Sequence, residues 1–390
     1  MGPAQATVVA GTRDVATFTT ETRRSRNVTP ALQQLEPDAG PLVTITAKTR
    51  KKATDDPKIE WFEDQLLPRF DTLAGALAAG DAVFTPNNVT YFRAGDLVRV
   101  NKNEIVLVTT TPAATDATVA ITRAFGEVAA AAAQIGDQLH IVGNSSQEGA
   151  RGRSVLSTQR VPQYNLCGII RDPWSMTNTA KATTTFAGQD WDEESMKQLI
   201  EHKKHIELQF IVGQRKELLT GTHPQRATRG IERWITSFAT DVNGPLTEQV
   251  WDGIMRTAFR YGKKTKLAIG SPIAMQAING FAKGKLRVVD KTKSYGISLQ
   301  SYENAGRTVL LTEHVSMSNL DLNDFSGIGG ELLILDMDDI VARYMKGRYT
   351  VHNMNIQDND EDARRDEYLS EVGLETHLEM KHAKAVNITG

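Results

Sequence analysis

The sequence predicts an α+β protein that carries a separate all-β module. Three observations predict this class: short β-branched runs recur between residues 71 and 143, a long helical pattern begins near residue 190, and strand and helix patterns alternate from about residue 240 onward. The 390 residues are 40% hydrophobic and 24% charged. This ordinary globular composition excludes wholesale disorder, and the length suffices for two or three domains.

Charge and cysteine content exclude several classes of function. The 45 basic and 47 acidic side chains give a net charge of -2, so nothing attracts the whole chain to nucleic acid or to acidic membranes. Cys167 is the only cysteine, which excludes an intramolecular disulfide and a zinc site built on cysteines. No uncharged run reaches the 18 or so apolar residues of a membrane-spanning helix, so we expect no membrane partner and no targeting segment.

The first 70 residues are predicted to be extended. Residues 1–42 show no sustained period and end in a cluster that breaks both helix and strand, so we expect an N-terminal arm. Residues 43–70 carry strand patterns at both ends. Four positive charges, on Lys48, Arg50, Lys51 and Lys52, fall within five positions of this segment. Such a cluster is typical of a solvated strand edge, and the functional alternative is a contact with an acidic neighbour.

Residues 71–143 are predicted to form a small β barrel or sandwich. Turn residues separate six strand candidates, at 83–84, 89–92, 97–100, 104–109, 118–122 and 138–142. Phe84, Tyr91 and Phe92 are expected in the core of this module. A Gly- and Arg-rich segment then leaves it, and residues 144–189 are interpreted as a return crossing.

The clearest helix is predicted over residues 190–213. Met196, Ile206 and Phe210 lie on its apolar side, together with Leu199, Ile200 and Ile211. Its other side, with Lys197 and Lys204 as well as Glu201 and Gln209, is expected to face water or another subunit. His202 and His205 lie three positions apart and could share a metal, but lysines fill the gap between them, so an exposed helix face is the better interpretation.

The second half of the chain is predicted to mix helices and strands around one core. A helix over 247–261 ends at Gly262, and a strand at 266–269 leads through Ser271 into a helix that ends by Gly280. Further strand candidates lie at 286–289, 308–311 and 331–335. The segment 358–367 then holds six acidic residues against Arg364 and Arg365, a local charge of -4.

The sequence shows no motif of an enzyme or a cofactor site. Asp358, Asp360 and Asp362 imitate the first ligands of a calcium loop, but Ala363 stands where that loop needs glycine and Leu369 where it needs glutamate. No Gly-x-Ser-x-Gly nucleophile elbow occurs, and no base is paired with Cys167. We therefore expect no catalysis, no metal and no cofactor.

The order of these features resembles the major capsid proteins of tailed bacteriophages with the Hong Kong 97-type fold. The Lys-rich strand before an aromatic and acidic stretch, KKATDDPKIEWFED at 51–64, is similar to one lineage of this family. Further similar stretches lie at 95–109, 122–126, 267–272 and 368–377, so the resemblance covers nearly the whole chain.

The resemblance implies a structural fold with named parts. These parts are an N-terminal arm at 1–42, an extended loop going out at 43–70 and returning at 144–189, a peripheral domain with a long spine helix at 190–239, an axial domain at 240–340, and the C-terminal strands of the peripheral domain at 341–390. The module at 71–143 departs from the minimal fold and is interpreted as an insertion in or beside the extended loop.

The resemblance also implies a function and partners. A member of this family is a major head protein that assembles with itself, as pentamers and hexamers, into the icosahedral shell that encloses double-stranded DNA. Its expected partners are a separate scaffolding protein, a portal protein, packaged DNA held by non-specific contact, and in some cases a decoration protein. Its location is the virion, after assembly in the cytoplasm of the bacterial host. Some relatives crosslink a loop lysine to a neighbour's asparagine; lysines are present here, no partner asparagine is assigned, and noncovalent assembly is expected.

The residues expected to make contacts between subunits carry opposite charges. They are the basic residues Lys48, Arg50, Lys51 and Lys52, the neighbouring Glu60 and Trp61, and the acidic residues Asp358, Asp360, Glu361 and Asp362. The cluster at 48–52 and the segment 358–367 could meet across subunits, which would guide register more than it adds affinity. Two other classes stay open: a virion-associated receptor- or carbohydrate-binding protein that uses the β module, and a hydrolase whose site would be a deep polar cleft.

Overall fold

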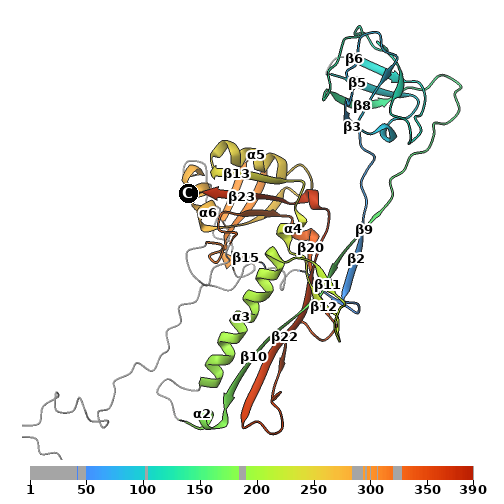
Figure 1. Cartoon of the computed structure of the whole chain (residues 1–390). Helices are drawn as coiled ribbons and strands as arrows, with labels where there is room; N and C mark the ends of the chain where they lie inside the picture. The colour runs from blue at the N-terminus through green and yellow to red at the C-terminus, as the bar shows by residue number, and fades with distance from the viewer. Residues whose placement is uncertain are drawn as a thin grey trace, which may run out of the picture. The chain divides into compact units, whose positions relative to one another are not determined.

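The computed structural model describes residues 42, 50–101, 104–183, 190–282, 293–294, 297–298, 300–304, 306–318 and 327–389 (Figure 1). The chain divides into two compact units. Unit 1 combines Met1–Glu60 with Tyr164–Gly390, and unit 2 is Trp61–Gln163. The predicted arm, apart from Leu42, and the strand candidate at 286–289 lie outside the described residues.

Unit 2 is an all-β module. Its strands are β3 (Phe70–Thr72), β4 (Val83–Phe84), β5 (Asp96–Val100), β6 (Glu104–Val108), β7 (Val119–Thr122) and β8 (Gln138–Asn144), in the spatial order β3-β8-β5-β6-β7-β4. Backbone bonds join the two edge strands: Ala74 N donates to Thr85 O at 2.8 Å, and Asn87 N donates to Thr72 O at 3.1 Å. The sheet therefore curls toward a closed barrel around a buried core that includes Phe84, Phe92 and Leu139, as the strand spacing predicts.

One predicted strand of unit 2 is wrong. Residues 89–92 were expected to be extended, but Val89–Tyr91 form the 3-10 helix η2. Val89 and Phe92 are both buried, and Phe92 N donates to Val89 O at 3.2 Å. Residues three positions apart share a face of a 3-10 turn, whereas a strand would have placed them on opposite faces. The β-branched and aromatic composition concealed this spacing.

The first sheet of unit 1 has five strands. These are β1 (Lys51–Thr54), β20 (Ile340–Met345), β22 (Ala363–Thr376) and β10 (Gly168–Thr177) in that order, with β21 (Val351–Asn353) also paired to β22. β1 runs parallel to β20, and the other pairs are antiparallel. The predicted long helix is α3 (Asp190–Val212), which lies along β10 and β22 (Figure 1). The short helix α2 (Asn178–Ala182) follows β10 directly.

The faces of α3 are only partly as predicted. Ile206, Phe210 and Ile211 are buried, as expected, but Met196 is 66% exposed. Lys204, predicted to face water or another subunit, is buried. The N-terminal part of the helix also contacts the sheet, since Trp191 lies against Trp174 and Ser195 Oγ is 2.9 Å from the Tyr368 hydroxyl. The aliphatic stem of a lysine can cover apolar surface, which allows Lys204 to be buried.

The second sheet of unit 1 has six strands. They are β13 (Ala239–Pro245), β23 (Ala383–Thr389), β19 (Leu332–Leu335), β14 (Thr265–Gly270), β18 (Arg307–Glu313) and β17 (Gln300–Asn304), in that order. β14 and β19 are almost wholly buried, as the runs of apolar residues at 266–269 and 331–335 predict. The helices α5 (Glu248–Ala258) and α6 (Pro272–Ala282) pack on this sheet and bury Trp251, Ile254 and Ile278.

The predicted starts of these two helices hold, but both C-terminal ends differ. Thr247 caps α5 by accepting a hydrogen bond from Val250 N, and the helix ends at Ala258, so Gly262, with a φ of 83° that favours glycine, lies in the turn beyond the helix. Ser271 Oγ accepts from Ala274 N at the start of α6. That helix continues through Gly280 to Ala282, because a glycine inside a helix costs only about 1 kcal/mol.

Short elements complete the described chain. They are β2 (Lys58–Glu63), paired with β9 (Val161–Leu166); β11 (Lys216–Leu218), paired with β12 (Gln225–Ala227); β15 (Lys293–Ser294), paired with β16 (Ile297–Ser298); α4 (Ile231–Trp234); η3 (Met337–Asp339); and η4 (Glu379–Lys381). Among the residues that the structure describes, no helix is long and apolar enough to cross a membrane.

Candidate functional site

The basic cluster predicted at 48–52 lies on an edge strand of unit 1, and much of it is engaged within the same chain. Lys48 lies outside the described residues. The Arg50 guanidinium pairs with the Asp338 carboxylate at 3.0 Å and also donates to Asp338 O. The Lys51 ammonium lies 5.0 Å from the centroid of the Tyr349 ring, and Lys52 is exposed. Only part of the cluster's charge is therefore free for an outside partner.

Glu60 and Trp61 differ in their surroundings. Glu60 is exposed and forms an ion pair with Lys58 on the same strand, β2. Trp61 is only 6% exposed, and its indole N–H donates to Glu63 Oε1 at 2.9 Å. Residues on one strand alternate between its two sides, so Glu60 rather than Trp61 is on the side open to a partner.

The acidic residues form an exposed loop between β21 and β22. We call residues 358–362 the acidic loop. Asp358, Asp360 and Glu361 are exposed, and among the described residues none of their carboxylates has an ion pair. Asp362 is also exposed and accepts a hydrogen bond from Asn178 Nδ2 at 2.5 Å. No group of three or more potential ligand residues in the described part of the chain is placed to hold a metal ion.

The structure does not bring the two predicted charge clusters together within one chain. The acidic loop precedes Ala363, the first residue of β22. Lys51 pairs with Ala342, which in turn pairs with Leu374 near the other end of β22. At about 3.3 Å per residue, the stretch from 363 to 374 spans about 36 Å. In one copy, the acidic loop and the basic edge are therefore far beyond contact distance.

Two arginines near the C-terminal end of β22 were not singled out from the sequence. The Arg215 guanidinium carbon lies 3.7 Å from the centroid of the Tyr164 ring, and that of Arg229 lies 4.3 Å from the centroid of Trp234. Lys58 Nζ lies 4.8 Å from the same Tyr164 ring. Cations over aromatic faces are attracted by the ring quadrupole, so the rings hold these charges in place. We call Arg215, Arg229, Tyr164 and Trp234 the arginine surface.

The backbone around Arg229 is fixed by a buried asparagine. Asn165 Oδ1 accepts from Arg229 N at 2.8 Å, and Asn165 Nδ2 donates to Arg229 O at 3.0 Å and to Leu374 O at 2.6 Å. Gly230 makes the close approach possible, since a Cβ there would lie 2.5 Å from Ile211 O. β9, β22 and the end of α3 thus position the arginine surface.

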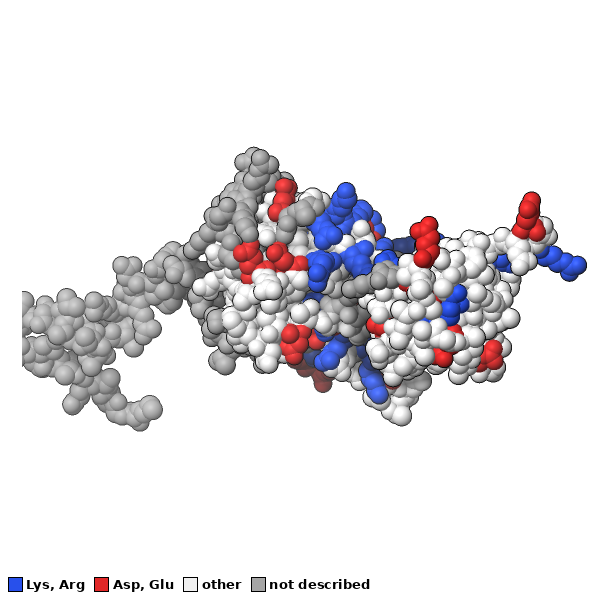
Figure 2. Space-filling view, turned by 90° about the horizontal axis from the view of Figure 1, so that it is seen from above, with Lys and Arg blue, Asp and Glu red and all other residues white. Residues whose placement is uncertain are grey.

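The nearby carboxylates are already occupied. Glu217 accepts from Arg226 at 2.8 Å, Glu232 pairs with Lys384 at 3.7 Å, and Glu379 accepts from the backbone of Thr236 at 2.7 Å. Burial, followed by the nearby positive charge of Arg215, lowers the pKa of Arg229 below its usual range, although the Glu379 carboxylate opposes this. In the described part of the chain, neither Arg215 nor Arg229 has an ion pair with a carboxylate. Figure 2 shows a group of lysine and arginine side chains in one view of the molecule, with acidic side chains beside them.

The sequence carried only a weak signal of this surface. Residues 215–233 hold five basic side chains against Glu217 and Glu232, but the charges are spread over nineteen positions with no run among them. The pairing of Arg215 with Tyr164 joins segments that are distant in sequence, so local pattern cannot reveal it.

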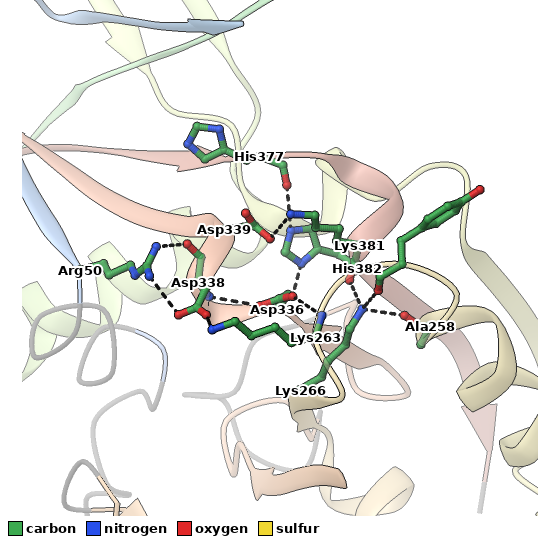
Figure 3. Close-up of polar contacts among 11 residues, drawn as sticks. Arg50, Ala258, Lys263, Lys266, Asp336, Asp338, Asp339, His377, Lys381 and His382 are labelled. Atoms are coloured by element: carbon green, nitrogen blue, oxygen red, sulfur yellow. Dashed lines mark hydrogen bonds and ion pairs between the residues drawn. The ribbon is translucent and has the colours of Figure 1, made fainter. Parts of the chain in front are cut away.

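A second polar cluster joins the two sheets of unit 1 and is structural (Figure 3). Lys266 is 1% exposed, and its ammonium donates to Ala258 O at 2.6 Å, to Tyr261 O at 2.9 Å and to Lys381 O. It therefore satisfies carbonyls at the C-terminal end of α5. Burial is the main cause that lowers the pKa of Lys266 to about 8.

His382 and Asp336 complete this junction. His382 is fully buried; its Nδ1 accepts from Asp336 N at 3.2 Å, and its Nε2 faces His377 O at 3.2 Å, which assigns the proton to Nε2 (Figure 3). Burial lowers the pKa of His382 to about 4. Asp336 also caps η3 by accepting from Asp338 N, the capping role expected of carboxylates at a strand end. Every group here is held by its own chain.

The interpretation of His202 as part of an exposed helix face is wrong. His202 is fully buried, with Nδ1 2.5 Å from Asp172 Oδ2 and Nε2 2.7 Å from Ser370 Oγ. His205 is half-exposed and lies 2.9 Å from the other Asp172 oxygen. The apolar period does not predict this contact, because it treats histidine as a polar residue. A histidine can nevertheless be buried when both of its ring nitrogens have hydrogen-bond partners.

The hydrogen bonds that join Asp172 to His202 and His202 to Ser370 have the order of the Asp-His-Ser triad of a hydrolase. However, Ser370 has no exposed surface, and its hydroxyl is also 3.0 Å from Thr350 Oγ1. Burial lowers the pKa of His202, although the Asp172 carboxylate opposes this. A substrate carbonyl cannot reach the Ser370 oxygen, so the trio fastens α3 to β10 and β22 instead.

Unit 2 contains a cavity of about 160 Å³ at one side of its barrel. Arg69, Tyr91 and Arg93 line it, and Arg153 reaches it while paired with Asp96. Tyr91 is thus half-buried at the edge of the core, whereas Phe84 and Phe92 are buried as predicted. The cavity is small and has both polar and apolar walls, with room for about ten waters or a small solute.

Comparison with known proteins identifies relatives of the whole chain. A family model described as SU10 major capsid protein matches residues 10–389. A major capsid protein of Pseudomonas phage PaMx41 is 22% identical over 242 residues, which cover 58% of this chain and 57% of that protein, so the match spans just over half of the relative's length. Among solved structures, the capsid of cyanophage A-1(L) matches with a TM-score of 0.51 at 8% identity, over 96% of this chain and 99% of that one. The predicted fold class, the Hong Kong 97-type fold, is confirmed.

Proposed function

Since this chain belongs to the SU10 major capsid protein family, we propose that many copies of it form the closed icosahedral shell that encloses the double-stranded DNA of a tailed bacteriophage. The single observation that carries this proposal is the family match over residues 10–389, nearly the whole chain. As a member of this family, the chain is a major capsid protein and a structural component of a virion.

The structure supports this role through surfaces that one copy leaves incomplete. β1 and β10 are the edges of one sheet, and β13 and β17 are the edges of the other. β2 and β9 form a ribbon of only two strands, which is marginal alone in water. Phe62 on β2 is 69% exposed and Val161 on β9 is 54% exposed. Strand edges and apolar side chains of this kind are stabilised when a second chain covers them.

The parts of the chain take their proposed roles from this assembly. Residues 1–42 act as the arm, 43–70 and 144–189 as the extended loop, 190–239 and 341–390 as the peripheral domain with α3 as spine, and 240–340 as the axial domain. The module at 71–143 is an insertion in the extended loop, and its own core supports this assignment. The compact unit is wider, Trp61–Gln163, because it includes the segments that lead to and from the barrel.

The partners follow from the same role. Copies of the chain form pentamers and hexamers by noncovalent contacts, with a separate scaffolding protein, a portal protein and, where present, a decoration protein, and packaged DNA is held without sequence preference. Assembly takes place in the cytoplasm of the bacterial host. The chain works without catalysis, since the one triad-like arrangement that we describe, at Ser370, is sealed from solvent.

The alternative function is a receptor- or carbohydrate-binding role for unit 2. The cavity beside Tyr91 favours it, because Arg69 and Arg93 could bind an acidic sugar there. A glycan array probed with the full-length chain tests this alternative, with Arg93→Ala as the matched variant. Binding that the variant loses would support it, and an array without any signal would exclude it.

Electron microscopy tests the shell. The chain is expressed alone and together with the reading frames beside its gene, and the products are sized by light scattering before negative staining. Closed shells, or rings of five and six copies, are the expected result. A compact monomer that persists at high concentration in both preparations would overturn the proposal.

A further inference from the structure

The arginine surface and the acidic loop are two halves of one contact that a single copy cannot make. The first half presents Arg215 and Arg229, each stacked on an aromatic ring and neither in an ion pair within the described residues. Beside them, the hairpin β11–β12 exposes Leu218 at 42% and Leu219 at 69%. Although β12 packs on β10, these two leucines stay exposed in one copy, and exposed apolar side chains are stabilised when a second chain covers them.

The second half presents the matching chemistry. Asp358, Asp360 and Glu361 are exposed without ion pairs in the described part of the chain. Met354, a few residues before them, is 60% exposed. The acidic loop thus combines carboxylates with a flexible apolar side chain, as the arginine surface combines guanidinium groups with exposed leucines. Arginine recognises carboxylates by two parallel hydrogen bonds, which gives such a contact geometric specificity.

We infer that the acidic loop of one copy docks on the arginine surface of a second copy. This inference rests on the proposed function and adds the residues of one intersubunit contact. Within a copy, Thr228 lies beside Leu374, because its hydroxyl contacts Leu374 N, whereas α2 and the acidic loop lie at the other end of β22 (Figure 1). The interval of about 36 Å along β22 prevents the two halves from meeting in one chain.

The contact that we infer is head-to-tail, in which each copy docks its acidic loop on one neighbour and receives the loop of another. Head-to-tail contacts close into a ring when the rotation between copies divides a full turn. The acidic loop therefore connects copies around a rotation axis of the shell.

The basic edge at β1 is the competing receiver. Arg50 already contacts Asp338, and Lys51 lies over Tyr349, so both are partly satisfied within the chain. Arg215 and Arg229 stack on aromatic rings and donate to the carbonyls of Tyr164 and Arg233, but neither forms an ion pair in the described part of the chain. A guanidinium has five N–H donors, so donors remain for a carboxylate from outside. This difference favours the arginine surface over Lys51 and Lys52.

A charge exchange tests the contact in assembled particles. We expect the Arg215→Glu, Arg229→Glu double variant to lower particle yield about tenfold, and Asp358→Lys with Asp360→Lys to do the same, because each places like charges together. Combining all four changes should restore the yield to within about threefold of wild type. Lys203→Glu, an exposed site on α3, is the matched control and should assemble normally. Circular dichroism of the unassembled variants checks that they fold.

The outcomes separate this inference from the proposed function. If the wild-type chain forms no particles, the shell proposal fails. If wild type and the arginine variant assemble equally well, only the docking inference fails. Loss of yield in Lys51→Glu with Lys52→Glu, with rescue by the acidic-loop variant, would assign the contact to β1 and overturn the inference.

A cysteine pair provides a second measurement that does not depend on yield. We expect Leu219→Cys with Asn359→Cys to form disulfides between copies when particles are oxidised, since a disulfide requires Cα atoms within about 7 Å. A head-to-tail contact gives a ladder of covalent oligomers on a non-reducing gel, whereas a two-fold contact gives dimers only. Cys167 does not interfere, because it is buried and burial raises its pKa to about 12. Particles that show no ladder would overturn the inference.

Discussion

Unit 2 pairs its buried charges within itself, whereas unit 1 contains such pairs and also a set of charges that it leaves unpaired. In unit 2, Glu104 is 3% exposed and accepts two hydrogen bonds from Arg123, at 2.7 Å each, and Asp96 pairs with Arg153 in the same unit. In unit 1, Arg215, Arg229 and the carboxylates of Asp358, Asp360 and Glu361 form no ion pair within the described part of the chain. Charges that are paired inside a module stabilise its fold, whereas unpaired exposed charges are available for contacts with other copies.

The largest effect is expected inside unit 2. Although burial raises the pKa of Glu104, Arg123 and the amides of Ala124 and Ala131 lower it overall, so the carboxylate is charged and fully engaged. Glu104→Ala leaves Arg123 buried without its partner and should lower the free energy of unfolding by about 4 kcal/mol. Denaturant unfolding of the unassembled chain measures this, with the exposed Glu127→Ala as control. A loss below about 1 kcal/mol would contradict the view that unit 2 closes its own charges.

This pair shows what a sequence can and cannot reveal. The alternation around Glu104 predicts strand β6 well, and the turn residues predict the barrel, because both depend on neighbours in the chain. The partner Arg123 lies nineteen positions away, and its choice depends on how β6 and β7 pair. The fold class and most elements were therefore predictable, while the pairing of charges was not.

The same limit applies to the candidate site in unit 1. The acidic loop was predicted from composition alone, since its charges fall in one run. The arginine surface was missed because Tyr164, Arg215 and Trp234 come from three separate segments. His202 was misassigned for a related reason: Asp172 and Ser370, which bind it, lie 30 and 168 positions away. Periodicity describes one element, whereas a site is made where several elements meet.

The second prediction concerns two buried groups of unit 1 with opposite dependence on pH. Burial raises the pKa of Glu331 to about 7, and Glu232 raises it further while Lys384 and Arg233 oppose this. The folded chain therefore holds a proton that the unfolded chain releases near pH 4.5, and stability falls as pH rises from 4.5 to 7. The pKa of His382, about 4, lies below its usual 6.5, so stability falls instead as pH drops from 6.5 to 4.

These two opposite dependences of the free energy of unfolding on pH should nearly cancel in the wild-type chain. Each amounts to about 3 kcal/mol over its range, at about 1.4 kcal/mol per unit of pKa shift. Glu331→Gln should expose the His382 slope, with stability that rises from pH 4 to 6.5, and His382→Gln should expose the opposite slope. Denaturant unfolding at several pH values measures both. Two variants with the flat profile of the wild type would show that neither group titrates as described.

A smaller loss is expected at the junction between the two sheets of unit 1. Lys266→Met keeps the aliphatic stem but leaves the carbonyls of Ala258, Tyr261 and Lys381 without a donor. Removing the buried charge offsets part of this loss, so we expect the free energy of unfolding to fall by about 2 kcal/mol. Lys264→Met, at an exposed neighbour, is the control. An unchanged stability would mean that the helix end of α5 finds other donors.

The smallest effect is expected where an ion pair of unit 1 faces solvent. Asp338 pairs with Arg50 at 3.0 Å and with Lys263, and the Asp338 and Arg50 side chains are 36% and 46% exposed. Exposed pairs contribute at most about 1 kcal/mol, because water and salt screen them, so Asp338→Asn should change the free energy of unfolding by about 0.5 kcal/mol. Unfolding in low and high salt measures it, and a loss above about 2 kcal/mol would show that exposed pairs hold this unit together. A small value carries a consequence for Arg215 and Arg229: if even paired surface charges contribute little to folding, stacked arginines without a carboxylate are better explained by a contact that forms during assembly.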